Sequence, residues 1–301
     1  MSAANKTLIF CHVPKTAGTT LNRIIESQYD PFRIHSIPGG QRIRAIEKFK
    51  ALPEERRRKL QVLKGHIEYG LHEHLPQPAT YMTMLREPVA QVVSSYFYGL
   101  SSRTHPLYKI LNDRKMGIEA YVDLAQWANN LQTKLLGGIP MARVQPITAL
   151  AAAQRGEIFA PERFIGEHAT VNTLAAAKRH LEEDFSVIGV TNQFEESVAL
   201  MIVAYGWDVP YFQSFRETKQ RPPAKIEAAI LDKIRALNAL DIELFAFGKN
   251  LFDRALERNH DAIERIRRGW RDYPQPGPVA ARLRAGVAWA RFAASLARSA
   301  L

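Results

Sequence analysis

The order of apolar and polar positions along the chain predicts short strands that alternate with helices. Four apolar runs have the length and composition of buried strands, at residues 7–13, 61–63, 79–85 and 185–190. Pro14 and Gly18 follow the first run, and Leu21, Ile24 and Ile25 then recur at helical spacing. The chain therefore opens with a strand–loop–helix unit.

Helical patterns dominate the rest of the chain. A charged, helical connection covers residues 42–60, and Pro88 stands where the first turn of a helix tolerates proline. Further helical patterns lie near residues 89–98, 117–128, 171–183, 192–205, 224–247 and 253–270. Strands that alternate with helices are typical of an α/β fold with a largely parallel sheet. We expect a P-loop-like parallel sheet flanked by helices, with a helix-rich C-terminal half.

The last part of the chain differs in composition from the rest. Prolines at residues 274–278 are typical of a stiff linker. In residues 279–301, arginines repeat every seven positions along one stripe and large apolar residues fall roughly opposite. This pattern predicts a basic amphipathic helix, which packs either on the domain or a second subunit, or lies on a membrane surface. We therefore divide the chain into a main domain, residues 1–273, and a linker with a C-terminal helix, residues 274–301.

Composition and charge indicate a basic globular protein. Of 301 residues, 46% are hydrophobic, which is too many for a disordered chain, and the formal net charge is +11. The excess lies at the two ends: residues 1–100 hold 14 basic and 8 acidic side chains, residues 101–251 hold 17 of each, and residues 252–301 hold 10 and 5. A basic balance suits nucleic acid, an anionic membrane or an anionic small ligand. Aromatic residues are not interleaved with the basic ones as in an RNA-binding motif, so we expect no nucleic-acid partner.

Cysteine usage and the N-terminal residues bear on the compartment. The only cysteine, Cys11, cannot form a disulfide within the chain. The first apolar run lacks the basic flank and the cleavage site of a signal peptide. We expect a cytoplasmic protein, with the C-terminal helix as one candidate for contact with the inner face of a membrane.

Residues 12–20, His-Val-Pro-Lys-Thr-Ala-Gly-Thr-Thr, carry the clearest chemical signal. A loop that closes on a helix N-terminus presents backbone N–H groups and the positive end of the helix dipole, which together favour a phosphate. Gly18 allows close approach of the backbone, Thr19 and Thr20 add hydroxyl groups, and Lys15 adds a cation. The alternative for this stretch is a tight strand–helix turn without a ligand.

The loop differs from that of nucleotide triphosphatases, which ends in Gly-Lys-Ser/Thr. Here the lysine precedes the glycine by three positions, and the apolar run 79–85 leads into Arg86 where a magnesium-binding carboxylate would be expected. These two differences disfavour a magnesium-dependent kinase. A small-molecule kinase of the P-loop type is kept as one alternative function, and a non-enzymatic protein that binds membrane surfaces is another.

A second candidate anion site combines Arg86 with Ser94. Arg86 ends a predicted strand and Ser94 follows about two helical turns later, so both side chains can reach one anion. An arginine at a strand end suits a phosphate, which it grips through two hydrogen bonds. The alternative is a surface pair between Arg86 and Glu87 beside a solvated serine.

Together these motifs resemble those of sulfotransferases that use 3′-phosphoadenosine 5′-phosphosulfate (PAPS). Residues 14–20, Pro-Lys-Thr-Ala-Gly-Thr-Thr, are similar to the family's 5′-phosphosulfate loop, and residues 86–96 are similar to its 3′-phosphate motif. Residues 65–69, Gly-His-Ile-Glu-Tyr, resemble the segment that carries the catalytic base in the heparan sulfate and uronyl 2-O-sulfotransferase branch of the carbohydrate type. Weaker similarities extend to about residue 250.

The resemblance implies a role for each matching residue. The sulfuryl group of PAPS would pass to a hydroxyl of a saccharide or glycoconjugate, with His66 as general base and Lys15 stabilising the leaving phosphate. Glu68 is the alternative base, or the group that orients His66. The cofactor-binding residues implied by the match are Pro14, Lys15, Thr16, Ala17, Gly18, Thr19, Thr20, Arg86 and Ser94.

The residues around His66 also raise the question of a metal. His66, Glu68, His72, Glu73 and His74 cluster in sequence, but their spacing lacks the clean helical histidine pair with a distant third ligand that typifies zinc sites. We expect a reaction that needs no metal. The identity of the acceptor and the oligomeric state, monomer or homo-oligomer, stay open at this point.

Overall fold

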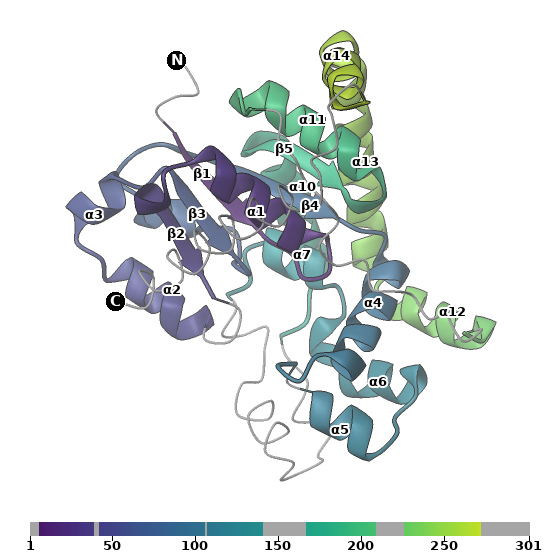
Figure 1. Cartoon of the computed structure of the whole chain (residues 1–301). Coiled ribbons are helices and arrows are strands. Elements are labelled where there is room, and N and C mark those ends of the chain that lie inside the picture. Colours follow the sequence, from purple (N-terminus) through teal and green to yellow (C-terminus); the bar gives the residue numbers. More distant parts are fainter. Residues whose placement is uncertain (1–5, 39–41, 106, 141–166, 209–225, 272–301) are drawn as a thin grey trace, which may run out of the picture. The chain divides into compact units, whose positions relative to one another are not determined.

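The computed structural model describes residues 6–38, 42–105, 107–140, 167–208 and 226–271. Its centre is a parallel five-stranded sheet with the strand order β2-β3-β1-β4-β5 (Figure 1). The strands are β1 (Thr7–Cys11), β2 (Ile34–Ile37), β3 (Val62–Gly65), β4 (Ala79–Leu85) and β5 (Phe185–Val190). The predicted α/β class with a parallel sheet flanked by helices is confirmed.

Helices connect the strands and make up most of the second half of the described chain. They are α1 (Gly18–Gln28), α2 (Arg42–Lys50), α3 (Glu54–Arg58), α4 (Pro88–Ser101), α5 (Tyr108–Asp113), α6 (Ile118–Leu124), α7 (Leu131–Leu136), α10 (Val171–Glu183), α11 (Phe194–Tyr205), α12 (Ala228–Leu237), α13 (Ala239–Arg258) and α14 (His260–Arg271). Short 3₁₀ turns lie at Pro31–Arg33, Leu71–His74, Gln126–Ala128 and Thr191–Gln193.

All four strands expected from apolar runs are present, and the structure adds β2. This strand reads Ile-His-Ser-Ile, so its sequence carries no apolar run, yet all four residues are buried. The ring of His35 packs against Phe49 of α2, with 5.4 Å between ring centroids. Packing against a helix therefore buries a strand that hydrophobicity alone does not reveal.

The connection at residues 42–60, expected as one helical stretch, consists of two helices. Helix α2 ends at Lys50, and α3 begins after Pro53. Proline disfavours the helical conformation of the residue before it, which explains the break at Leu52.

The chain forms two compact units. The first contains residues 1–85, 182–219 and 248–301, and therefore the whole sheet; the second contains residues 86–181 and 220–247. The strand order changes direction at β1, because the chain first moves from β1 to one side and β4 then pairs on the other side. In open α/β sheets, ligands bind beyond the carboxyl ends of the strands at such a switch point. A ligand is therefore expected beside the residues that follow β1.

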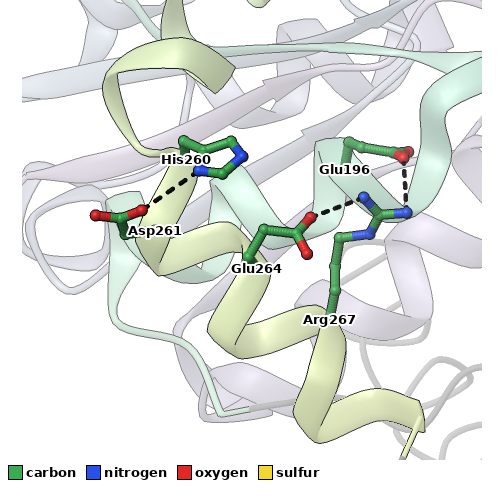
Figure 2. Close-up of polar contacts among 5 residues, drawn as sticks. All are labelled: Glu196, His260, Asp261, Glu264 and Arg267. Atoms are coloured by element: carbon green, nitrogen blue, oxygen red, sulfur yellow. Dashed lines mark hydrogen bonds and ion pairs between the residues drawn. The ribbon is translucent and has the colours of Figure 1, made fainter.

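Helix α14 packs on α11 within the first unit. Ile263 is buried, and Arg267 pairs with Glu196 of α11 at 3.3 Å and with Glu264 of its own helix at 3.1 Å (Figure 2). A second close pair on this helix joins His260 and Asp261. The expected helix near residues 253–270 is thus present, as the end of α13 and α14. The proline-rich linker and the amphipathic helix expected at residues 274–301 lie outside the described residues.

No helix in the described ranges is both long enough and apolar enough to cross a membrane.

Candidate functional site

The loop after β1 has an unusual backbone. Lys15 and Ala17 both adopt positive φ angles, 68° and 61°, which cost a residue with a side chain about 1–3 kcal/mol each. Thr16, fully buried between them, donates its hydroxyl to the carbonyl oxygen of Val13 at 2.8 Å and so closes the turn. Left-handed residues within such a turn direct N–H groups into a concave nest that binds anions. The backbone of the loop at residues 12–20 therefore resembles the nests that bind anions.

Helix α1 begins at the end of this loop without a side-chain cap. Ala17 occupies the capping position and has no side-chain oxygen to offer the first N–H groups of the helix. The N–H groups of Thr20 and Leu21 bond back to the carbonyl of Ala17, at 3.1 and 3.3 Å. The N–H groups at the very start of a helix have no carbonyl within the helix, and with the helix dipole they favour a negative ligand.

Gly18 is required by the ring of His12. An ideal Cβ at position 18 would lie 1.7 Å from Nε2 of His12, so any side chain here would displace the imidazole. The ring of His12 also stacks on Phe10, with centroids 5.2 Å apart, and its exposed fraction is 8%. His12 is therefore a packed residue at the end of β1.

His66 follows β3 directly and contacts His12 in two ways. Their rings stack at 4.1 Å between centroids, and Nδ1 of His66 donates to the backbone carbonyl of His12 at 2.8 Å. Because the carbonyl can only accept, the proton of a neutral His66 resides on Nδ1 and Nε2 is left as a proton acceptor. His66 is partly exposed, whereas His12 behind it is buried. The neutral ring can therefore accept a proton at Nε2, and the residue is partly accessible to solvent.

A buried polar network also contacts His12. Lys64 of β3 donates to Glu26 at 2.6 Å and to the side-chain oxygen of Asn22 at 3.2 Å, both on α1. An ammonium group only donates, so the Asn22 oxygen must face it and the Asn22 amide nitrogen faces Nδ1 of His12 at 3.5 Å. Lys64 and Glu26 are 2% and 1% exposed. The network thus runs from a buried ion pair to the histidine that holds His66.

Two cationic side chains act on His66. Burial, together with the charges of Arg42 and Lys15, lowers the pKa of His66 to about 4, against the opposing effect of the bond to His12. The negative charge of Glu68 acts in turn on Arg42, whose pKa burial lowers to about 10. Glu68 itself is 7% exposed. Because Nδ1 of His66 bonds to His12, Glu68 does not orient His66 through that nitrogen.

The buried histidines make the first testable prediction, which concerns acid stability. The pKa of His12 lies well below 6.5, and burial lowers the pKa values of His35 and His66 to about 4. Below pH 6.5 the unfolded chain takes up protons that the folded chain does not, so folding stability falls as pH falls. The loss reaches about 1.4 kcal/mol per pH unit for each such histidine, and above pH 6.5 these groups contribute no slope.

Urea unfolding between pH 7.5 and 5.5 measures this slope. The ring of His35 packs on Phe49 of α2 rather than on His12 or His66, so His35→Gln serves as the matched variant. At pH 5.5 unfolding of the variant should take up about one proton less than unfolding of the parent protein, whereas at pH 7.5 the two should be nearly equal. An identical slope in the two proteins would contradict the assignment of a lowered pKa to His35.

Arg86 and Ser94 belong to the second unit, and each lies where the sequence indicated. Arg86 directly follows β4 and is partly exposed, and Ser94 lies on α4. Glu87 does not serve mainly as an ion-pair partner, because its carboxylate caps α4 by accepting from the N–H groups of Val89 and Ala90 at 3.0 and 2.7 Å. Burial lowers the pKa of Arg86, and the charge of Glu87 partly offsets this.

The histidines beyond residue 70 do not join the arrangement around His66 in any described contact. Nδ1 of His72 lies 2.9 Å from the hydroxyl of Tyr81, within an aromatic cluster that includes Tyr69. Within the described residues, no three His, Cys, Asp or Glu side chains are grouped so that they could hold a metal ion.

Sequence reasoning missed Arg42, Lys64, Glu26 and Asn22. Two of these had a detectable signal: Lys64 interrupts an apolar strand run, and Glu26 lies beside the apolar stripe of α1. A charged residue at a buried position requires a partner, so each could have been used to search for the other.

Comparison with known proteins identifies the family of the chain. None of the curated proteins compared with the chain matches it. The model of the sulfotransferase family matches residues 1–248, which include the loop after β1, His66, and Arg86 with Ser94. The match covers most of the chain and the complete sheet, and so the chain belongs to the sulfotransferase family.

Proposed function

We propose that the protein transfers the sulfuryl group of PAPS to a hydroxyl of a saccharide or glycoconjugate, and that His66 is the general base. Membership of the family supports sulfuryl transfer in general. The observation that carries the assignment of the base is the bond from Nδ1 of His66 to the His12 carbonyl, which leaves Nε2 able to accept a proton. A PAPS donor and a saccharide acceptor rest on the motif resemblance.

The residues of the first unit suit the phosphosulfate end of PAPS. The positive φ angles at Lys15 and Ala17, the uncapped start of α1 and the side chain of Lys15 are all features that favour a polyanion. We propose residues 14–20 as the 5′-phosphosulfate loop. Arg86 and Ser94 are proposed as ligands of the 3′-phosphate, because an arginine after a strand end suits bidentate binding of phosphate.

The proposed reaction divides the work between two side chains. PAPS supplies a sulfuryl group whose bond to the 5′-phosphate oxygen breaks as the acceptor oxygen attacks sulfur. Nε2 of His66 takes the proton of the acceptor hydroxyl. The ammonium group of Lys15 donates to the phosphate oxygen that receives the electron pair, where the negative charge increases.

Nucleotide selectivity provides the second prediction. The protein should bind 3′-phosphoadenosine 5′-phosphate (PAP) at least about a hundredfold more tightly than AMP, since a bidentate charged contact to phosphate contributes several kcal/mol. Arg86→Ala should remove this preference while leaving AMP affinity unchanged. Isothermal titration with both nucleotides measures the two affinities. Arg235→Ala is the matched control, because Arg235 is an exposed arginine of the same unit, paired with Asp232. Equal affinities in the parent protein would refute the proposed donor.

The acceptor is identified by transfer of labelled sulfate from PAPS to a panel of glycans, glycolipids and phenols. Product on glycans or glycolipids supports the proposal, whereas product on phenols alone would overturn its saccharide part.

The proposals for localisation and partners rest on the sequence only. These are a cytoplasmic location and contact of residues 279–301 with a membrane surface or a second subunit. Binding of the full chain to anionic vesicles, compared with a chain that ends at residue 278, tests the membrane contact.

A further inference from the structure

The second unit holds the backbone of Arg86 with a glutamine side chain. The amide oxygen of Gln132, Oε1, accepts from the N–H of Arg86 at 3.1 Å, and its amide nitrogen, Nε2, donates to the carbonyl of Arg86 at 2.8 Å. The two bonds fix which end of the amide is oxygen, because the N–H can only donate and the carbonyl can only accept. Gln132 is 1% exposed. One buried side chain therefore pairs with both polar groups of a single residue.

Arg86 lies where regular structure offers its backbone little support. Strand β4 ends at Leu85, and α4 begins at Pro88 with Glu87 as its cap. The positions of N and C of a residue set the direction of its Cα–Cβ bond, and hence the point from which a long side chain extends. A bond to each group therefore restricts the base of the Arg86 side chain.

Gln132 is itself held in place by a buried carboxylate. Asp241 accepts from the backbone N–H groups of Gln132 and Thr133 at 3.0 and 2.7 Å, and is 1% exposed. Asn130 adds two hydrogen bonds to this arrangement. Its side-chain oxygen accepts from the backbone N–H of Asp241 at 3.0 Å, and its backbone N–H donates to the side-chain oxygen of Asn238 at 2.9 Å. Residues more than 100 positions apart thus cooperate to place one amide group.

We propose that Gln132 is a positioning residue that sets nucleotide selectivity by holding Arg86 in the orientation that grips the 3′-phosphate. This inference rests on the proposed role of Arg86. Without Gln132 the guanidinium group of Arg86 still carries its charge, but the backbone of Arg86 can rotate. A small displacement of the guanidinium group then weakens a bidentate contact to phosphate strongly. Asp241 contributes indirectly, through the backbone of Gln132.

Replacing Gln132 by methionine tests the proposal, because methionine keeps the length of the side chain and removes both hydrogen bonds. The ratio of AMP to PAP dissociation constants should fall at least about tenfold, and AMP affinity should stay unchanged. A role confined to folding would lower the unfolding temperature without changing this ratio. Leu135→Met is the control: Leu135 is a fully buried apolar residue of the same helix, α7, so its side chain makes no hydrogen bond, and the ratio of this variant should equal that of the parent protein.

A double-mutant cycle separates this inference from the proposed function. In an Arg86→Ala background, Gln132→Met should not change the ratio further, because the residue through which it acts is gone. If the parent protein shows no preference for PAP, the proposed role of Arg86 fails. A different outcome contradicts only the positioning role of Gln132: the parent protein prefers PAP, Arg86→Ala loses this preference, and Gln132→Met keeps it.

Gln132→Glu keeps the test decisive if the methionine variant does not fold. A carboxylate still accepts from the N–H of Arg86 but places an acceptor against the Arg86 carbonyl. We expect a reduced ratio here too, and an unchanged ratio would overturn the proposal.

Discussion

Replacement of His66 by alanine is expected to lower kcat for sulfuryl transfer by about 100- to 10,000-fold. PAP affinity should stay close to that of the parent protein, because His66 acts on the acceptor proton rather than on the nucleotide. The structural basis is the bond from Nδ1 to the His12 carbonyl, which keeps the proton of the neutral ring away from Nε2. Single-turnover transfer rates and PAP titrations measure the two effects separately.

Two further variants make this result specific. His72→Ala is the control, because the ring of His72 contacts the hydroxyl of Tyr81 instead of His12, and it should leave kcat unchanged. Glu68→Gln tests the alternative base. If Glu68→Gln removes the rate and His66→Ala preserves it, the general base is Glu68 and our assignment is wrong.

The pH dependence of the parent enzyme gives an independent signature of His66. Since burial and the charges of Arg42 and Lys15 hold its pKa at about 4, the acidic limb of kcat/KM should lie near that value rather than near 6.5. A bound donor is anionic and offsets these cationic charges, so the limb of kcat should lie at a higher pH than the limb of kcat/KM. Coincident limbs at pH 6.5 would contradict the described environment of His66.

The second large effect concerns stability. Lys64→Met should reduce the free energy of unfolding by about 3–5 kcal/mol, because it leaves the buried carboxylate of Glu26 without its cation. The ion pair is short, 2.6 Å between Nζ and Oε1, and both side chains are almost completely buried. Burial raises the pKa of Glu26 while Lys64 opposes this rise, so loss of Lys64 drives the carboxyl toward protonation.

Urea unfolding of three variants tests this explanation. The double variant Lys64→Met/Glu26→Leu removes both charges and should recover much of the lost stability, as buried ion pairs replaced by apolar side chains commonly do. Lys50→Met is the exposed counterpart, since it breaks the surface pair with Glu47, and it should cost less than about 1 kcal/mol. If Lys64→Met also lowers the free energy of unfolding by less than about 1 kcal/mol, the buried pair does not stabilise the fold.

Local sequence patterns were sufficient for most of the sheet and for the loop. Strands β1, β3, β4 and β5 are apolar runs, and the loop before α1 is marked by Pro14, Lys15 and Gly18 within a few positions. The strands of a parallel sheet are buried on both faces, so their sequences are short runs of apolar residues. Such runs can be recognised without knowledge of the structure. Strand β2 was not predicted because two of its four residues are polar and become buried only when α2 packs over them.

By itself, the sequence determined the α/β class, the order of the motifs and the residue types at the candidate site. Only the tertiary structure decided which nitrogen of His66 accepts a proton, which cation neutralises Glu26 and which side chain holds Arg86. The reason is distance along the chain: these contacts join residues 54, 38 and 46 positions apart, whereas periodicity and turn chemistry act over a few residues. Folding brings such partners together, and their hydrogen bonds then fix tautomer and orientation, which no local pattern specifies.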